Sequence, residues 1–162
     1  MASEPVPVDL LGVRIQLPSQ TPIVLLREQG GAGLHVPIWI GAVEATAIAY
    51  AMEGVVPERP LTHDLFVGVL STLSASIDRV VVSDMHDQVF FADLVLTLDG
   101  ATHSVSARPS DAIALAARVG APIFVAPQVL AEAGIELRDE DEEDEIERFR
   151  EFLDDLDPED FS

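Results

Sequence analysis

Three strand-like segments, separated by turn residues, come before any helical pattern in this chain. Residues 6–17, 23–27 and 34–40 are rich in Val, Ile and Leu, and the turns between them contain Pro, Ser and Gly. Consecutive strands that are joined by short turns favour an antiparallel meander. This order constrains the fold, because a doubly wound α/β sheet requires strands that alternate with helices.

The remaining segments mix both kinds of element. Helices are predicted at residues 42–53, 62–76, 109–120 and 128–133, and strands at residues 79–83, 89–98, 102–107 and 122–126. Asp99-Gly100, between two of these strands, is a strong hairpin signal, and we expect a turn at residues 84–87. Thr62 and Ser110 are predicted to cap the second and third helices. The sequence therefore predicts a single α+β domain, with helices packed on an antiparallel or mixed β-sheet.

Composition excludes several classes of protein. The chain has no cysteine, which excludes disulfides, thiolate metal sites and cysteine nucleophiles. All nine basic residues are arginines, which also excludes Schiff-base and P-loop lysine chemistry. The apolar stretches are interrupted well before a membrane-spanning length, and no basic, apolar leader opens the sequence. We therefore expect a cytoplasmic protein without a membrane segment.

Acidic charge is concentrated at the C-terminus. Residues 136–162 hold 15 Asp and Glu against 3 Arg, and residues 1–135 hold 14 against 6. We expect an α+β domain at 1–135 and an acidic tail at 136–162 that binds either its own domain or a basic protein partner. The domain itself is acidic, which disfavours a broad nucleic-acid interface. The helical spacing of four apolar residues predicts an amphipathic helix in part of the tail: Ile146, Phe149, Leu153 and Leu156.

Two Arg-Pro pairs precede predicted helices, and each is followed by a hydroxyl residue and an Asp. A helix N-terminus carries partial positive charge and free N–H groups, so these segments are suited to hold an anion. Arginines add bidentate contacts to phosphate. The candidate phosphate-binding residues are Arg59, Arg108 and Ser110.

Carboxylates and one histidine accompany these arginines. Glu44 lies in the first turn of a predicted helix among apolar neighbours. The positive end of the helix dipole alone explains a carboxylate there. If the carboxylate is buried among these neighbours, it needs a cationic or metal partner. His63 is suited to acid–base catalysis or metal binding. The candidate catalytic residues are Glu44, His63, Asp64 and Asp111, and the candidate ligands of a divalent cation are Glu44, Asp64 and Asp111. The aromatic residues in apolar segments are expected in the core: Trp39, Phe66, Phe90, Phe91 and Phe124.

Three motifs together resemble the bifunctional nuclease (BFN) domain family of bacteria and plants. They are Pro37-Ile38-Trp39-Ile40-Gly41 with Glu44-Ala45, Arg59-Pro60 with Thr62-His63-Asp64-Leu65, and the segment from Arg108 to Ala116. The resemblance spans roughly residues 8–126. It implies an α+β fold, a homo-oligomer, and the DNase and RNase activity reported for plant members.

Two classes of function follow. In the first, the chain is a nuclease that hydrolyses DNA or RNA with a divalent cation, Mg²⁺ or Mn²⁺, while its arginines stabilise the phosphate. In the second, it is a non-enzymatic, oligomeric binding or regulatory protein whose motif residues form a buried salt-bridge network. Binding of a small phosphorylated ligand is an intermediate possibility, since it needs few arginines and no basic surface.

Overall fold

Seven strands form one mixed sheet in the computed structural model, which describes residues 4–137. Four helices pack against this sheet, so the predicted α+β fold is confirmed. The strands are β1 (Val6–Gln16), β2 (Thr21–Glu28), β3 (His35–Trp39), β4 (Ser76–His86), β5 (Val89–Leu98), β6 (Ala101–Ala107) and β7 (Ile123–Val125). The helices are α1 (Ala42–Glu53), α2 (Thr62–Thr72), α3 (Pro109–Val119) and α4 (Pro127–Ala133). The predicted acidic tail lies almost entirely outside the described residues.

The sheet joins two antiparallel meanders through one short strand. Its strand order is β3-β2-β1-β7-β4-β5-β6. Strand β7 pairs antiparallel with β1 and parallel with β4, and all other pairs are antiparallel. The predicted hairpin at Asp99-Gly100 is confirmed: both residues have positive φ, 52° and 77°, as a two-residue turn of this kind requires.

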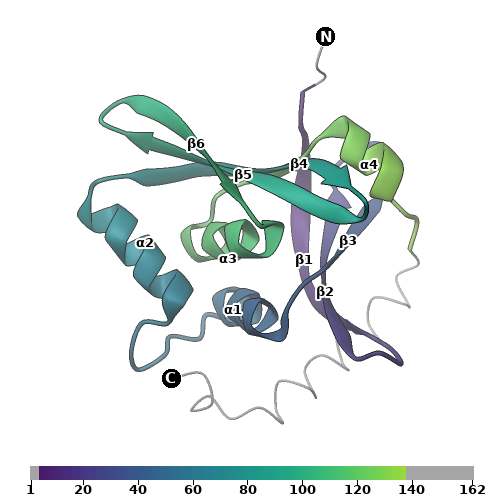
Figure 1. The fold of residues 1–162 in the computed structure, drawn as a ribbon, viewed down its shortest axis with the longest axis horizontal. Helices are drawn as coiled ribbons and strands as arrows, with labels where there is room; N and C mark the ends of the chain where they lie inside the picture. The colour runs from purple at the N-terminus through teal and green to yellow at the C-terminus, as the bar shows by residue number, and fades with distance from the viewer. Residues whose placement is uncertain (1–3, 138–162) are drawn as a thin grey trace.

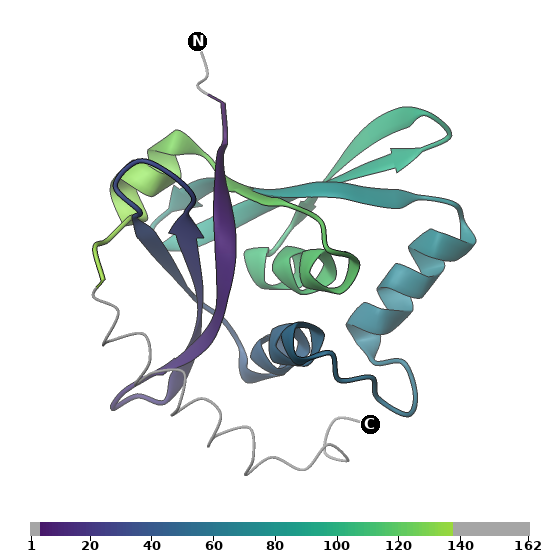
Figure 2. The ribbon, with the colours of Figure 1, turned by 180° about the vertical axis from the view of Figure 1, so that it is seen from behind.

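The sheet curves around two helices. Figures 1 and 2 show α1 and α3 side by side on the inner face of the sheet, with α2 alongside α3. Helix α4 is separated from these helices by β1 in both views. Small side chains allow α1 and α3 to approach each other and the sheet closely. The buried positions of the two helices include Ala45, Ala47, Ile48, Ala49, Ala112, Ile113, Ala114 and Ala116.

The helix starts differ from the prediction. Leu61, not Thr62, is the N-cap of α2, and Arg108, not Ser110, is the N-cap of α3. At α2 the carboxylate of Asp64 accepts the backbone N–H of Leu61 at 3.0 Å, so an acidic side chain replaces the expected hydroxyl cap. At α3 the fixed φ of Pro109 suits the first helical position, which places Ser110 one residue inside the helix.

Two element boundaries were also predicted wrongly. Helix α2 ends at Thr72 and β4 begins at Ser76, so the predicted helix was too long. Strand β4 continues to His86, through most of the turn expected at residues 84–87, because Met85 and His86 still pair with β5. Hydrogen bonds to a neighbouring strand stabilise polar residues that local propensity assigns to a turn.

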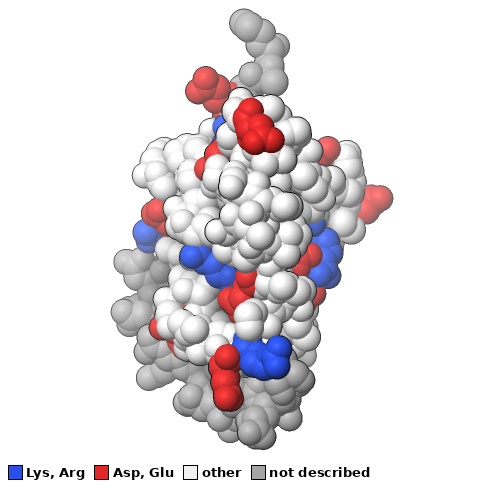
Figure 3. Space-filling view, turned by 90° about the vertical axis from the view of Figure 1, so that its left-hand side faces the viewer, with Lys and Arg blue, Asp and Glu red and all other residues white. Residues whose placement is uncertain are grey.

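Three of the aromatic residues expected in the core are exposed. Trp39 is 51% exposed, Phe66 43% and Phe91 41%. In β3, Val36 and Ile38 point into the core, so the alternation of a strand turns Trp39 outward. Helix α2 has no buried residue, and Figure 3 looks onto its side of the molecule. No helix within residues 4–137 combines the length and the apolar character that crossing a membrane requires.

Candidate functional site

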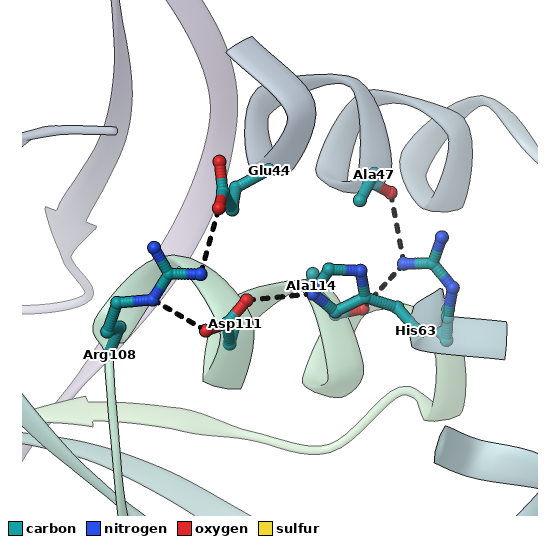
Figure 4. Close-up of polar contacts among 7 residues, drawn as sticks. Glu44, Ala47, His63, Arg108, Asp111 and Ala114 are labelled. Carbon is teal, nitrogen blue, oxygen red and sulfur yellow. Dashed lines mark hydrogen bonds and ion pairs between the residues drawn. The ribbon is translucent and has the colours of Figure 1, made fainter. Parts of the chain in front are cut away.

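The predicted site residues lie at the starts of three helices that pack together. Glu44 is in the first turn of α1, His63 and Asp64 are in the first turn of α2, and Arg108 and Asp111 are at the start of α3. Helix α3 contacts both α1 and α2, and α1 and α3 lie on the inner face of the sheet (Figure 1). The fold therefore brings residues that are far apart in the sequence into one region (Figure 4).

Four of these residues form a continuous polar chain, which we call the Arg108 cluster: Glu44, His63, Arg108 and Asp111. The guanidinium of Arg108 donates from Nη2 to Glu44 Oε1 at 2.8 Å and from Nε to Asp111 Oδ2 at 2.8 Å. The other oxygen of Asp111, Oδ1, lies 3.0 Å from His63 Nε2. Figure 4 shows that Asp111 lies between the arginine and the histidine.

One side of the Arg108 cluster is open to solvent. The side chain of Arg108 is 66% exposed, whereas those of Glu44 and His63 are 16% and 13% exposed. Burial alone would raise the pKa of Asp111, but hydrogen bonds from Arg108 and His63 outweigh burial and lower that pKa. Hydrogen bonds to Asp111 and Glu44 raise the pKa of Arg108. Asp111 and Arg108 are therefore both ionised near neutral pH.

Asp64 belongs to a separate set of contacts around Arg118. Arg118 donates from Nε to Asp64 Oδ1 at 2.8 Å, and from Nη1 to the carbonyl oxygens of Ala47 and Ala114, each at 3.0 Å. Its side chain is only 9% exposed. Burial alone would raise the pKa of Asp64, but the hydrogen bonds from Arg118 and from the N–H of Leu61 lower it. Arg118 thus connects α1, α2 and α3 to one another.

Sequence reasoning missed Arg118. It lies in the last turn of α3, where a basic residue is explained by the helix dipole alone. The available signal was its spacing from Asp111: residues two helical turns apart lie on the same face. The side chains of Asp111 and Arg118 therefore both point from α3 toward α2, while the opposite face of α3 is buried.

The structure does not gather all of the predicted residues. Arg59 is exposed and forms no ion pair within residues 4–137. In the described part of the chain, no group of three or more His, Asp or Glu side chains could hold a metal ion. Asp64, one of the three predicted metal ligands, instead pairs with Arg118. The catalytic, phosphate-binding and metal-binding roles stay predictions.

Two pockets flank these contacts. The first, of about 370 Å³, lies beside Arg108 and is also lined by Trp39, Gly41, Phe90 and Ser110. It lies between the end of β3, the β4–β5 turn and the start of α3. The second, of about 550 Å³, lies over Asp64 and Arg118 and has mainly apolar walls. Both are of the size that small ligands occupy, about 300–1,000 Å³.

The face of the molecule in Figure 3 does not resemble a broad nucleic-acid interface. On the face shown in Figure 3, the arginines of the described residues form separate spots, and acidic side chains lie beside them. Within the Arg108 cluster, two carboxylates face one guanidinium. Long-range attraction of a polyanion therefore has little support on this face.

Comparisons with known proteins identify the family of this chain. The model of the bifunctional nuclease domain matches residues 24–138, which include all of the candidate site residues. An uncharacterized protein of Mycobacterium tuberculosis is 44% identical over 162 residues, covering 95% of this chain and 96% of that protein.

Two plant proteins are more distant relatives. Bifunctional nuclease 1 of Arabidopsis thaliana is 31% identical over 107 residues, which cover 64% of this chain and 33% of the plant protein. Bifunctional nuclease 2 of the same plant is 29% identical over 114 residues, covering 67% and 35% respectively. With the domain match extending over most of the chain, this protein belongs to the bifunctional nuclease domain family.

Proposed function

We propose that this chain hydrolyses phosphodiester bonds of DNA or RNA at the Arg108 cluster. The observation that carries the proposal is the 3.0 Å contact between His63 and Asp111 beside the exposed guanidinium of Arg108. A histidine that is oriented by a carboxylate is a general base, and an accessible arginine is a phosphate ligand. The names of the plant relatives support the reaction class.

The contact supports different roles for the two nitrogens of His63. An ionised carboxylate only accepts hydrogen bonds, so the proton shared with Asp111 belongs to Nε2 of the imidazole. In this tautomer the lone pair is on Nδ1, and we assign to this atom the role of taking the proton of the attacking water. Asp111 holds the ring in this tautomer and stabilises the imidazolium that forms. Arg108 binds the phosphate and offsets the charge that develops on its oxygens.

A divalent cation is part of the proposal because the cluster is formally negative. Two carboxylates against one guanidinium oppose the approach of a phosphate. Glu44 and Asp111 are the ligands that we assign to Mg²⁺ or Mn²⁺, in competition with Arg108. Mg²⁺ is commonly held by one or two carboxylates, with water and substrate phosphates in its other positions. Bound there, the cation would supply positive charge against the phosphate oxygens.

The alternative, in which the motif residues form a structural salt-bridge network, fits Asp64 and its partner Arg118. The side chain of Arg118 is largely covered and is bonded to Asp64 and to two backbone carbonyls, as expected for a contact that holds helices together. We therefore assign Asp64 a structural role and restrict the catalytic proposal to the Arg108 cluster. Binding of a small phosphorylated ligand is the second candidate function, and the size of the pocket beside Arg108 and the acidic domain favour it.

Cleavage of short single-stranded DNA and RNA, with Mg²⁺ or Mn²⁺, tests the proposal. Purified wild type is compared with His63→Ala and with Arg27→Gln, a variant that removes an exposed arginine paired with Asp9 on a distant part of the sheet. Wild type and Arg27→Gln should cleave, and folded His63→Ala should not. Equal trace activity in all three proteins would indicate a contaminating nuclease and overturn the proposal.

A further inference from the structure

The only tryptophan of the chain is half exposed on an edge strand. Trp39 is the last residue of β3 and is 51% exposed. Its indole Nε1 donates to Gln16 Oε1 at 2.5 Å, which satisfies the polar edge and holds the ring in place. A fixed aromatic surface in water is unfavourable for folding, and it is well suited to stacking on a flat ligand.

Trp39 lines the same pocket as the phosphate-binding candidates. Arg108 and Ser110 contribute the start of α3 to that pocket, and Gly41 contributes the start of α1. Ser110 is 6% exposed, and its side chain makes no hydrogen bond within residues 4–137. The hydroxyl is not among the fully enclosed, unpaired polar atoms of residues 4–137, so it reaches the pocket and is free to donate to an oxygen of a ligand there.

The size and charge of the site restrict the ligand. A volume of about 370 Å³ suits one small molecule or one unit of a polymer. The acidic domain gives a long polyanion little attraction, whereas stacking on an aromatic ring needs no basic surface. One pocket thus combines an arginine, an unpartnered hydroxyl and an exposed indole.

We propose that Trp39 is a stacking platform for a nucleobase whose phosphate lies at Arg108 and Ser110. The substrate is therefore a nucleotide unit with an unpaired base, as in single-stranded nucleic acid, because bases inside a duplex have no free face. This inference rests on the proposed function in that both use the pocket beside Arg108. It concerns binding, however, and is testable without any cleavage.

Fluorescence of Trp39 reports the stacking directly, since no other tryptophan contributes. The full chain is titrated with adenosine monophosphate and, separately, with ribose 5-phosphate, which has the same phosphate but no base. A tryptophan amide in the same solutions corrects for absorption by the nucleotide. Adenosine monophosphate should quench Trp39 and ribose 5-phosphate should not. Equal effects of the two compounds, or none, would overturn the proposal.

Variants separate the base from the phosphate. With a labelled single-stranded DNA, Trp39→Ala should raise the Kd by about tenfold or more, which corresponds to the loss of one stacked base. Phe66→Ala removes another exposed aromatic residue, which lies outside the pocket, and should leave the Kd unchanged. Ser110→Ala should weaken binding of adenosine monophosphate and of ribose 5-phosphate alike. A Kd of folded Trp39→Ala equal to that of wild type would contradict the platform.

The two proposals fail in different ways. Quenching by the nucleotide without any cleavage would support the platform and reject the nuclease. Cleavage that is equally efficient in wild type and Trp39→Ala would support the nuclease and reject the platform. A concentration-dependent blue shift of the Trp39 emission in the absence of ligand would show that a second copy of the chain covers this residue, and it would also reject the platform.

Discussion

His63 Nε2 lies 3.0 Å from Asp111 Oδ1, a contact between residues 48 positions apart that joins the start of α2 to the start of α3. Arg108 holds the second oxygen of the same carboxylate. Asp111 is thus oriented from both sides, and its lowered pKa keeps it an acceptor near neutral pH. This single carboxylate connects the proposed base to the proposed phosphate ligand.

Replacement of Asp111 by asparagine should therefore lower the rate of cleavage. The amide can present an N–H to Nε2, which favours the wrong tautomer of His63 while the shape of the side chain is kept. We expect kcat to fall by about 10²- to 10⁴-fold, the usual contribution of a general base. Single-turnover kinetics on folded Asp111→Asn would measure this effect, and a rate close to that of wild type would rule out the assigned role.

Arg108→Gln tests the phosphate ligand. The side chain of Arg108 is largely exposed, so we expect the variant to fold. Loss of a donor to the phosphate should lower kcat/KM by about 10²-fold or more. Arg27→Gln carries the same change of charge and should retain the wild-type kcat/KM. If both variants lost activity equally, net charge and not a specific contact would be the cause.

Arg118 should matter for stability more than for the reaction. Arg118→Met leaves Asp64 without its cation and removes the side-chain donor that reaches the carbonyls of Ala47 and Ala114. Removal of one partner from a fully buried pair typically destabilises by about 3–5 kcal/mol, and we expect a smaller loss here because the side chain of Asp64 is partly exposed. Urea denaturation should therefore show a clearly lower free energy of unfolding for Arg118→Met. The double variant Arg118→Met with Asp64→Asn should recover part of the loss, because no unpaired charge is left.

The contrast between Trp39 and Arg118 explains what the sequence could predict. The first meander and the hairpin depend on local patterns and short turns, which are visible in the sequence. The complete strand order, with β7 between β1 and β4, and the meeting of the motif residues depend on contacts between distant parts of the chain, which the sequence does not show. The exposure of Trp39 was also visible, because Val36 and Ile38 alternate with it, but the apolar character of the segment outweighed that alternation in our prediction. Arg118 depends on partners in α1 and α2, and only the packing of three helices brings these partners together.

Local propensity was misleading at the helix starts for a similar reason. Thr62 and Ser110 are good caps by residue type, but Asp64 satisfies the free N–H of Leu61 and Pro109 fixes the first turn of α3. Ser110 consequently lies inside the first turn of α3, where it lines the pocket beside Arg108.

Acid should weaken the contribution of Asp64 to stability. Its pKa is lower in the folded chain than the ordinary value of about 3.9, so its charged form stabilises the fold above that pH. This stability is lost as the pH falls below about 3.9 and through the folded pKa. The difference in free energy of unfolding between wild type and Asp64→Asn should therefore be constant near neutral pH and shrink in acid. A difference that stays constant down to the lowest pH would contradict the lowered pKa.

Removal of divalent cations should abolish cleavage while leaving the fold intact. Glu44 and Asp111 outnumber Arg108, so without a cation the phosphate meets a formally negative cluster. We expect EDTA to stop the reaction and Mg²⁺ or Mn²⁺ to restore it. The thermal unfolding temperature should change little, because no described group of residues forms a preassembled metal cage.

Glu44→Gln removes one proposed ligand and should raise the concentration of Mn²⁺ required for half-maximal cleavage. The acidic tail is a second source of cation binding, so isothermal titration with Mn²⁺ should compare wild type with Glu44→Gln. Full activity in EDTA, or an unchanged requirement for Mn²⁺ in Glu44→Gln, would show that Arg108 and His63 act without a cation at this site.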